Sequence, residues 1–139
     1  MSEIFVLAEH RRGELRDITL GMLSKGRELS EKLHAELTAV LLGHNVKNFA
    51  EKLRAHAKKV LVVEDARLEN FSSETYQKVL SHIIKERKPP LVLIGHTCFG
   101  MELAPSLAAE LGMPLATDCI NIEFQNGNAI ATRQMYGGK

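Results

Sequence analysis

The residues from Gly95 to Gly100 have the pattern of a ligand-binding loop. The apolar run LVLIG (91–95) leads into G-x-x-x-x-G, and a helical pattern follows. Such an arrangement often cradles a phosphate, because the free N–H groups and the dipole of a helix N-terminus attract anions. A P-loop would continue with Lys and Ser or Thr, whereas Met101 and Glu102 stand here. We therefore favour a turn or a partner contact over nucleotide binding, which stays open.

Two further sets of residues have types that can do chemistry. Cys98 and His96 could form a nucleophile and its base, but no third group that would orient them is evident. We interpret them as a half-buried cysteine and a surface histidine. Arg133, on the last predicted strand, fits two roles equally well. It is either a solvated edge-strand residue that discourages aggregation or a contact to a ligand or partner.

Composition and charge exclude several classes of function. The 139 residues are 45% hydrophobic and 25% charged, which suits one globular domain. The net charge is +1, and positive and negative residues are interspersed along the chain. The sequence has no basic stripe, so nucleic acid is not an expected partner. Neither the two cysteines nor the six histidines have the spacing of a metal site. No apolar run approaches the roughly 20 residues of a membrane span, and the N-terminus lacks signal-peptide features. We expect a cytoplasmic protein without membrane insertion.

Four short apolar runs predict the strands that position the loop. None alternates polar with apolar residues, which is typical of parallel strands buried on both faces. Helical patterns lie between the runs, so we expect an α/β fold with a mostly parallel sheet and helices on both faces. The runs are residues 4–8, 37–43, 60–64 and 91–95.

Each helical pattern has an apolar stripe and terminal signals. The stripes are Ile18, Met22, Leu29 and Leu33; Val46, Phe49, Ala50 and Leu53; Tyr76, Val79, Leu80, Ile83 and Ile84; and Leu103, Leu107, Ala108 and Leu111. We expect N-caps at Asp17, Asn45 and Ser72 or Ser73. Gly112 is expected to follow the last helix. Pro105 belongs in a first helical turn, which predicts a start near residues 101–104.

The C-terminal segment has a different pattern. Ile120, Ile122 and Phe124 alternate with polar residues, and Asn126-Gly127 is a strong signal for a two-residue hairpin turn. A second strand is predicted at about residues 129–134. We expect a mostly parallel sheet of about five strands, with a C-terminal antiparallel hairpin at its edge. The Gly-Gly near the C-terminus directly follows a predicted strand, which is more typical of a truncated chain than of a natural terminus.

Three segments together resemble the N-terminal domain of the electron transfer flavoprotein alpha subunit. They are IFVLAEHRRGELRDITL, GHTCFGMELAPSLAAELGMPLATDC and TRQMYGGK. Their order, spacing and position in the chain fit that family, and the resemblance covers essentially all 139 residues. It implies a fold of the adenine nucleotide alpha hydrolase-like class over residues 1–139.

The resemblance also implies partners and cofactors. Family members pair an alpha with a beta subunit, carry FAD, and pass electrons from flavin dehydrogenases, such as acyl-CoA dehydrogenases, to an acceptor. They are cytoplasmic in prokaryotes and lie in the mitochondrial matrix of eukaryotes. The redox FAD belongs mainly to a C-terminal alpha domain whose signature is absent from this sequence, and a second nucleotide to the beta subunit. We therefore expect a scaffold domain with no catalytic residues of its own, binding no cofactor when isolated.

One departure from the family pattern bears on the loop. The family usually has G-R-D-L-A-P-R where this chain has Gly100, Met101 and, at the last position, Ser106, so an anion contact through both arginines is lost. The resemblance makes seven residues candidates for contacts with the beta subunit or a flavin. They are Gly95, His96, Thr97, Gly100, Arg133, Gly137 and Gly138.

Two other functions compete with this hypothesis. A universal-stress-type protein would share the sheet and bind ATP, often as a homodimer, but its late glycine-rich phosphate motif is not found. An adenylating hydrolase of the pyrophosphatase-loop kind needs S-G-G-x-D-S after the first strand, where this chain has residues 9–13, EHRRG. We also expect the isolated chain to expose an apolar docking patch and to dimerise through it.

Overall fold

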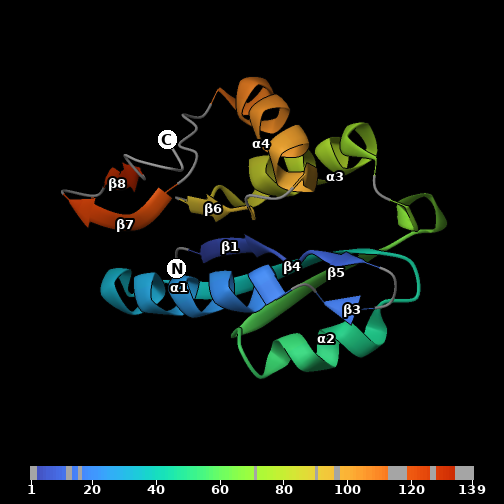
Figure 1. Cartoon of the computed structure of the whole chain (residues 1–139), viewed down its shortest axis with the longest axis horizontal. Helices are drawn as coiled ribbons and strands as arrows, with labels where there is room; N and C mark the ends of the chain where they lie inside the picture. Colours follow the sequence, from blue (N-terminus) through green and yellow to red (C-terminus); the bar gives the residue numbers. More distant parts are fainter. Residues whose placement is uncertain are drawn as a thin grey trace.

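The fold is built on a central sheet of four parallel strands in the order β5-β4-β1-β6 (Figure 1). The computed structural model describes residues 3–11, 14–15, 17–70, 72–89, 91–95, 98–112, 119–125 and 128–133. All four predicted parallel strands are confirmed. They are β1 (Glu3–Leu7), β4 (Glu36–Gly43), β5 (Lys59–Glu64) and β6 (Leu91–Leu93).

Helices cover both faces of the sheet, as predicted (Figure 1). Successive residues of β1 point to opposite faces: Ile4 and Val6 join one buried cluster, whereas Phe5 and Leu7 join the other. The first cluster includes residues of α1 and α2, and the second includes residues of α3 and α4. The helices are α1 (Asp17–Leu33), α2 (Lys47–Arg54), α3 (Ser73–Arg87) and α4 (Cys98–Leu111).

The buried face of α1 differs from the predicted stripe. Ile18 is 38% exposed, whereas Thr19, Leu23 and Gly26 are buried. A Cβ atom at Gly26 would lie only 2.7 Å from the Leu37 side chain, so the helix sits close to the sheet. The prediction for Ile18 was wrong because small and polar residues share the buried face, which a stripe of large apolar residues does not reveal.

The stripes of α2 and α3 are confirmed, but only one of their predicted caps is. Ser72 precedes α3, and its hydroxyl accepts a hydrogen bond from the Thr75 N–H at 3.4 Å. Val46, not Asn45, occupies the N-cap position of α2, and no side chain caps that helix. Asn45 instead has a positive φ of 57°, which Asn tolerates in a tight connection.

Helix α4 starts earlier than predicted. It begins at Cys98, so Pro105 lies inside the helix rather than in its first turn. Pro105 has no N–H to donate to the Met101 carbonyl, yet Leu103 and Leu107 on either side of it are buried against the sheet. Packing therefore outweighs the local cost of proline. Gly112 adopts a φ of 66° directly after the helix, as expected.

The C-terminal strands form their own ladder. β7 (Cys119–Gln125) and β8 (Asn128–Arg133) pair antiparallel with each other and with no other described strand. The parallel sheet therefore has four described strands, one fewer than the predicted five or so, because the hydrogen bonds of β7 and β8 are made within the pair. The predicted turn at Asn126-Gly127 lies outside the described residues.

Three short elements were not predicted. β2 (His10–Arg11) and β3 (Glu14–Leu15) form a two-stranded antiparallel sheet directly after β1. A 3-10 helix, η1 (Ala66–Leu68), follows β5. Elements of two or three residues are too short for hydrophobic periodicity to identify.

Candidate functional site

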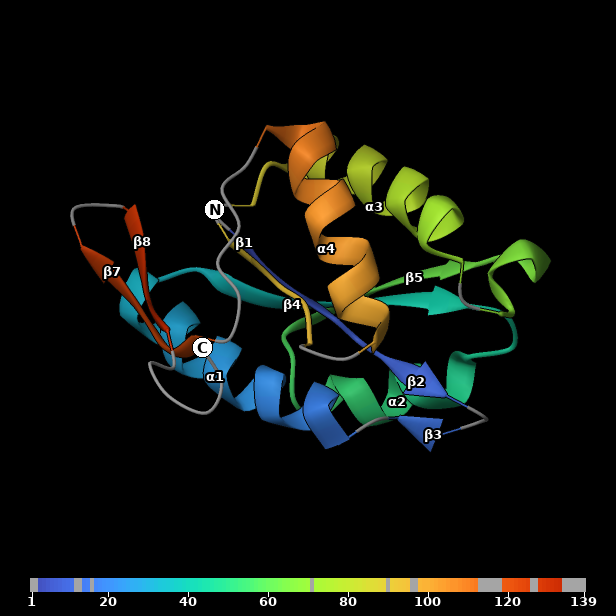
Figure 2. The same cartoon turned by 45° about the horizontal axis from the view of Figure 1, so that its top comes forward.

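The strand order places the candidate site at the carboxyl ends of β1 and β6. The chain runs from β1 to β4 and β5 on one side, and then returns to add β6 on the other side of β1. Ligands of open α/β sheets bind outside such a switch point. Two segments meet the site: the one that follows β1, beginning at Ala8, and the one that runs from Gly95 into the first turn of α4, where Gly100 lies. Figure 2 shows the ends of β1 and β6 and the start of α4.

Gly95, which follows β6, and Gly100, in the first turn of α4, lie in close contact. A Cβ atom at Gly100 would lie 1.8 Å from the Gly95 carbonyl oxygen, so that oxygen fills the space where a side chain would be. Gly95 is buried as well, and a Cβ atom there would lie 3.1 Å from Ile18 Cγ1. The structure therefore brings these two predicted site residues together in a packing role, between α1 and α4.

The polar residue that follows the loop points away from it. The Ser73 hydroxyl of α3 donates to a Glu102 carboxylate oxygen at 3.0 Å, so Glu102 lies along the side of α4. Farther down α4, Glu110 accepts hydrogen bonds from Ser81 and Gln77 of α3. The bond from Ser81 is the main reason that the pKa of Glu110 is lowered. These bonds fix the two helices to each other.

Thr19 holds the loop after β1. Its hydroxyl oxygen accepts a hydrogen bond from the Glu9 N–H at 2.8 Å and donates to the Glu9 carbonyl at 2.9 Å. Thr19 is fully buried and Glu9 is 8% exposed, so both bonds are shielded from water. Sequence reasoning missed Thr19, because a threonine within a helical pattern carries no signal of a tertiary partner.

The Leu42 carbonyl, near the carboxyl end of β4, is contacted by polar side chains from both sides of the sheet. His10 Nε2 lies 2.7 Å from that oxygen, and the Tyr76 hydroxyl donates to it at 3.2 Å. The His10 ring also packs against Phe49, with 5.2 Å between ring centroids. Burial is the main cause that raises the pKa of the Tyr76 hydroxyl. These side chains therefore have structural roles at the carboxyl end of the sheet.

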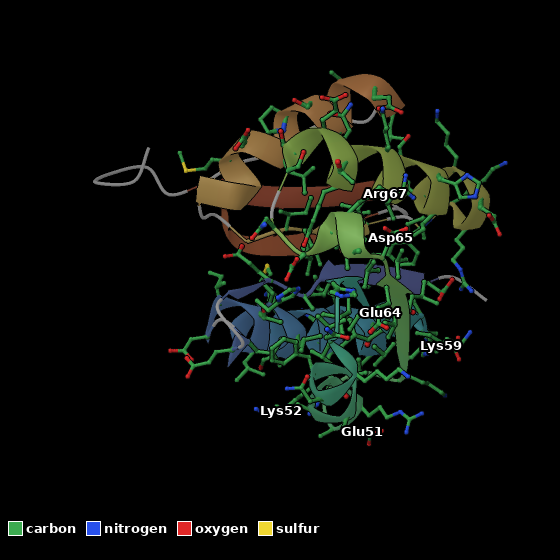
Figure 3. All side chains as sticks on the ribbon, turned by 90° about the vertical axis from the view of Figure 1, so that its right-hand side faces the viewer. Glu51, Lys52, Lys59, Glu64, Asp65 and Arg67 are labelled. Atoms are coloured by element: carbon green, nitrogen blue, oxygen red, sulfur yellow. The ribbon has the colours of Figure 1, made fainter. Side chains whose placement is uncertain are left out.

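Asp65 and Arg67 form a charged pair after β5 (Figure 3). An Asp65 oxygen accepts from the Arg67 backbone N–H at 2.9 Å, which caps η1, and the carboxylate accepts two bonds from the guanidinium at 3.1 and 2.9 Å. These hydrogen bonds, the side-chain ones first, lower the pKa of Asp65 to about 2.

Replacing Arg67 with methionine will raise the pKa of Asp65 toward its ordinary value of 3.8. Because the folded-state pKa is lowered, the pair contributes stability above about pH 4, and that contribution is lost as the pH falls toward 2. NMR titration of the Asp65 side chain measures both values. An unchanged midpoint in Arg67→Met would show that Arg67 does not cause the shift.

Two hollows on the described surface lie elsewhere. One of about 280 Å³ lies at the amino ends of β4 and β5, where Arg27, Arg54 and His56 contribute to its lining. A second, of about 180 Å³, lies between β5 and α3. Within the described residues no group of three or more His, Cys, Asp or Glu side chains is arranged to hold a metal ion.

Apolar side chains are exposed beside these two glycines. Met101, which follows Gly100, is 57% exposed, and Ile18, which packs on Gly95, is 38% exposed. Two large apolar groups beside tightly packed glycines are more typical of a protein contact than of a small-molecule pocket.

Of the other candidate residues, the structure describes only the backbone of Arg133. His96, Thr97, Gly137 and Gly138 lie outside the described residues. Arg133 ends β8, where its backbone pairs with Cys119, and its side chain is not among those described. Figures 1 and 2 both draw the β7–β8 ribbon away from the first turn of α4.

The comparison with protein families decides the identity of the domain. The model of the electron transfer flavoprotein domain matches residues 4–139. This chain belongs to the electron transfer flavoprotein family. The resemblance in the sequence is thereby confirmed, and the universal-stress alternative is not favoured. Among the described helices, none is long and apolar enough to cross a bilayer.

Curated relatives of this electron transfer flavoprotein domain are named for electron transfer. The alpha subunit of Clostridium acetobutylicum is 44% identical, over 97% of this chain and 41% of the relative. That of Bacillus subtilis is 38% identical, over 99% and 42%. The acryloyl-CoA reductase electron transfer subunit beta of Anaerotignum propionicum is 35% identical, over 88% and 34%. The chain thus spans about two fifths of the length of these alpha subunits.

The described residues do not fit a flavin at the switch point. FAD is larger than a drug-sized ligand, whose pockets span roughly 300 to 1,000 Å³, whereas Gly95 and Gly100 lie in close contact at this point. The two hollows are smaller than that range and lie away from the loop. We therefore assign no step of flavin chemistry to these residues.

Proposed function

We propose that this domain is a partner-docking scaffold of an electron transfer flavoprotein alpha subunit. In the complete protein, it would serve electron transfer from acyl-CoA or other flavin dehydrogenases to an acceptor. The observation that carries the proposal is the close contact of Gly95 with Gly100, beside exposed Ile18 and Met101. Tightly packed glycines beside apolar groups favour binding of a protein over binding of a nucleotide.

The partner in this proposal is the electron transfer flavoprotein beta subunit. Burial of Ile18 and Met101 in that contact would remove apolar area from water, at roughly 25 cal/mol per Å². FAD would then belong to the heterodimer and not to this domain alone, in line with the poor fit at the switch point. We place the complex in the cytoplasm of a prokaryotic cell.

The finer features of the fold belong to the same proposal. We assign the sheet to the adenine nucleotide alpha hydrolase-like class, which the order β5-β4-β1-β6 supports. We further assign the ladder of β7 and β8 to a C-terminal hairpin. His96, Thr97, Arg133, Gly137 and Gly138 stay proposed contacts to the beta subunit or to a flavin at the interface.

Substitution of Met101 tests the docking surface. Met101→Lys is expected to weaken binding of the cognate beta subunit at least about tenfold, because a lysine ammonium would lose water in an apolar contact. Titration calorimetry measures the dissociation constant. Met101→Leu keeps an apolar group of similar volume and is the matched control, expected to bind within about threefold of the original chain.

Three results would contradict the proposal. Failure of the unaltered chain to bind the beta subunit at micromolar concentrations would show that the beta subunit is not its partner. Equal affinities of the Lys and Leu variants would show that Met101 is not part of the docking surface. Release of stoichiometric FAD or ATP from the purified, denatured chain would show instead that the domain holds a nucleotide by itself.

A further inference from the structure

Strand β5 is an edge of the described sheet and is more exposed than its neighbours. It pairs with β4 on one side only. Each residue of β5 is at least partly exposed, whereas β1 is buried throughout. Val62, near the middle, is 41% exposed and helps line the hollow between β5 and α3. Every second N–H and C=O group of an edge strand points away from the sheet, so this edge can pair with another strand.

Charged residues limit such pairing at the ends of the strand but not at its centre. Lys59 and Glu64 lie at the two ends of β5 (Figure 3). Between them the sequence is Val60, Leu61, Val62 and Val63. Proteins commonly protect long apolar edges with central charges, bulges or proline. The central four residues of β5 have none of these, and so favour pairing with a matching strand.

One face of this edge is complementary to itself. Val60, Val62 and Glu64 alternate along β5 and so share a face of the sheet, and Lys58 lies one residue before the strand. In a two-fold antiparallel pair centred on Leu61, Lys58 stands opposite Glu64 of the second copy, and Val60 opposite Val62. A two-fold axis perpendicular to the sheet keeps each side chain on its own face, so this register is compatible with a closed dimer.

The two charged groups are accessible for this contact. The Lys58 side chain is 70% exposed, and its Nζ lies 3.8 Å from a Glu36 oxygen, a long ion pair. Glu64 is exposed and accepts a hydrogen bond from the Val46 N–H at 3.3 Å. Neither contact encloses its carboxylate or ammonium group, so each can also face an opposite charge on a second chain.

We propose that β5 is a self-association edge, at which two copies of this chain join their sheets through antiparallel β5 strands. The occupant is a second copy because Lys58 and Glu64 carry opposite charges, each three residues from Leu61, with branched apolar residues between them. Pairs of this kind stabilise antiparallel ladders. The inference does not rest on the proposed function, because β5 is separated from the β6 edge by β4 and β1.

Sedimentation equilibrium of the full chain, from micromolar to hundreds of micromolar, tests the edge. We expect a reversible dimer and, for Val62→Lys, a dissociation constant raised at least about tenfold. Leu20→Lys is the matched control, since Leu20 is also 41% exposed but lies on α1. It is expected to dimerise like the original chain. A monomer at every concentration, or equal effects of both variants, would overturn the proposal.

Charge reversal tests the register. Lys58→Glu places like charges opposite each other twice in the dimer and is expected to raise the dissociation constant about tenfold. The double variant Lys58→Glu, Glu64→Lys restores opposite charges and should return within about threefold of the original value. A double variant that folds, by circular dichroism, but dimerises no better than the single one would overturn this register.

Discussion

Replacing Gly100 with alanine is expected to destabilise the domain by at least about 3 kcal/mol, because a Cβ atom there would lie 1.8 Å from the Gly95 carbonyl oxygen. The neighbour is backbone rather than the end of a flexible side chain, so α4 and the loop must move apart. Chemical denaturation of Gly100→Ala against the original chain measures the loss in free energy of unfolding.

Gly21→Ala is the matched control for this substitution. Gly21 lies within α1, and a Cβ atom there meets nothing within 4 Å. Alanine should therefore stabilise the domain by about 0.5–1 kcal/mol through reduced freedom of the unfolded chain. If Gly100→Ala were as stable as Gly21→Ala, the close contact of Gly95 with Gly100 described above would be incorrect.

Thr19→Val is expected to cost about 2–4 kcal/mol although it preserves the shape of the side chain. The substitution removes the hydroxyl that bonds both the N–H and the carbonyl of Glu9 in a buried place. Each buried polar group that loses a partner costs roughly 1–3 kcal/mol. The free energy of unfolding measures this cost, and the exchange rate of the Glu9 amide shows where it arises.

Thr19→Ser separates the hydroxyl from the methyl group. Serine keeps both hydrogen bonds to Glu9 and loses one buried methyl group, so we expect a loss of only about 1 kcal/mol. Equal stabilities of the Val and Ser variants would show that the hydroxyl contributes no more than packing does.

Much of the fold could be predicted from the sequence because its elements carry strong local signals. The runs at 4–8 and 37–43 are continuously apolar, since both faces of β1 and β4 are covered. The cap at Ser72 and the left-handed residue at Gly112 follow from the properties of single residue types. Such features depend on near neighbours in the chain, which sequence patterns report directly.

The errors arise where tertiary packing outweighs local preference. Pro105 lies inside α4 because flanking leucines are buried, and Ile18 is exposed because Thr19 and Gly26 face the sheet instead. Sequence patterns also could not decide whether the candidate site is an open cradle for a ligand or a packed turn. The spacing of Gly95 and Gly100 suits either an open cradle or a closed turn, and only their contact in space distinguishes the two.

The alternation of β1 between two cores makes the strand sensitive to insertions and deletions. Ile4 and Val6 pack on one side of the sheet, and Phe5 and Leu7 on the other. One added residue in the middle of β1 would exchange the faces of all that follow and disturb both cores at once. The length of this strand is therefore under a tighter constraint than its exact apolar composition, and homologous chains should vary there by substitution and not by indels.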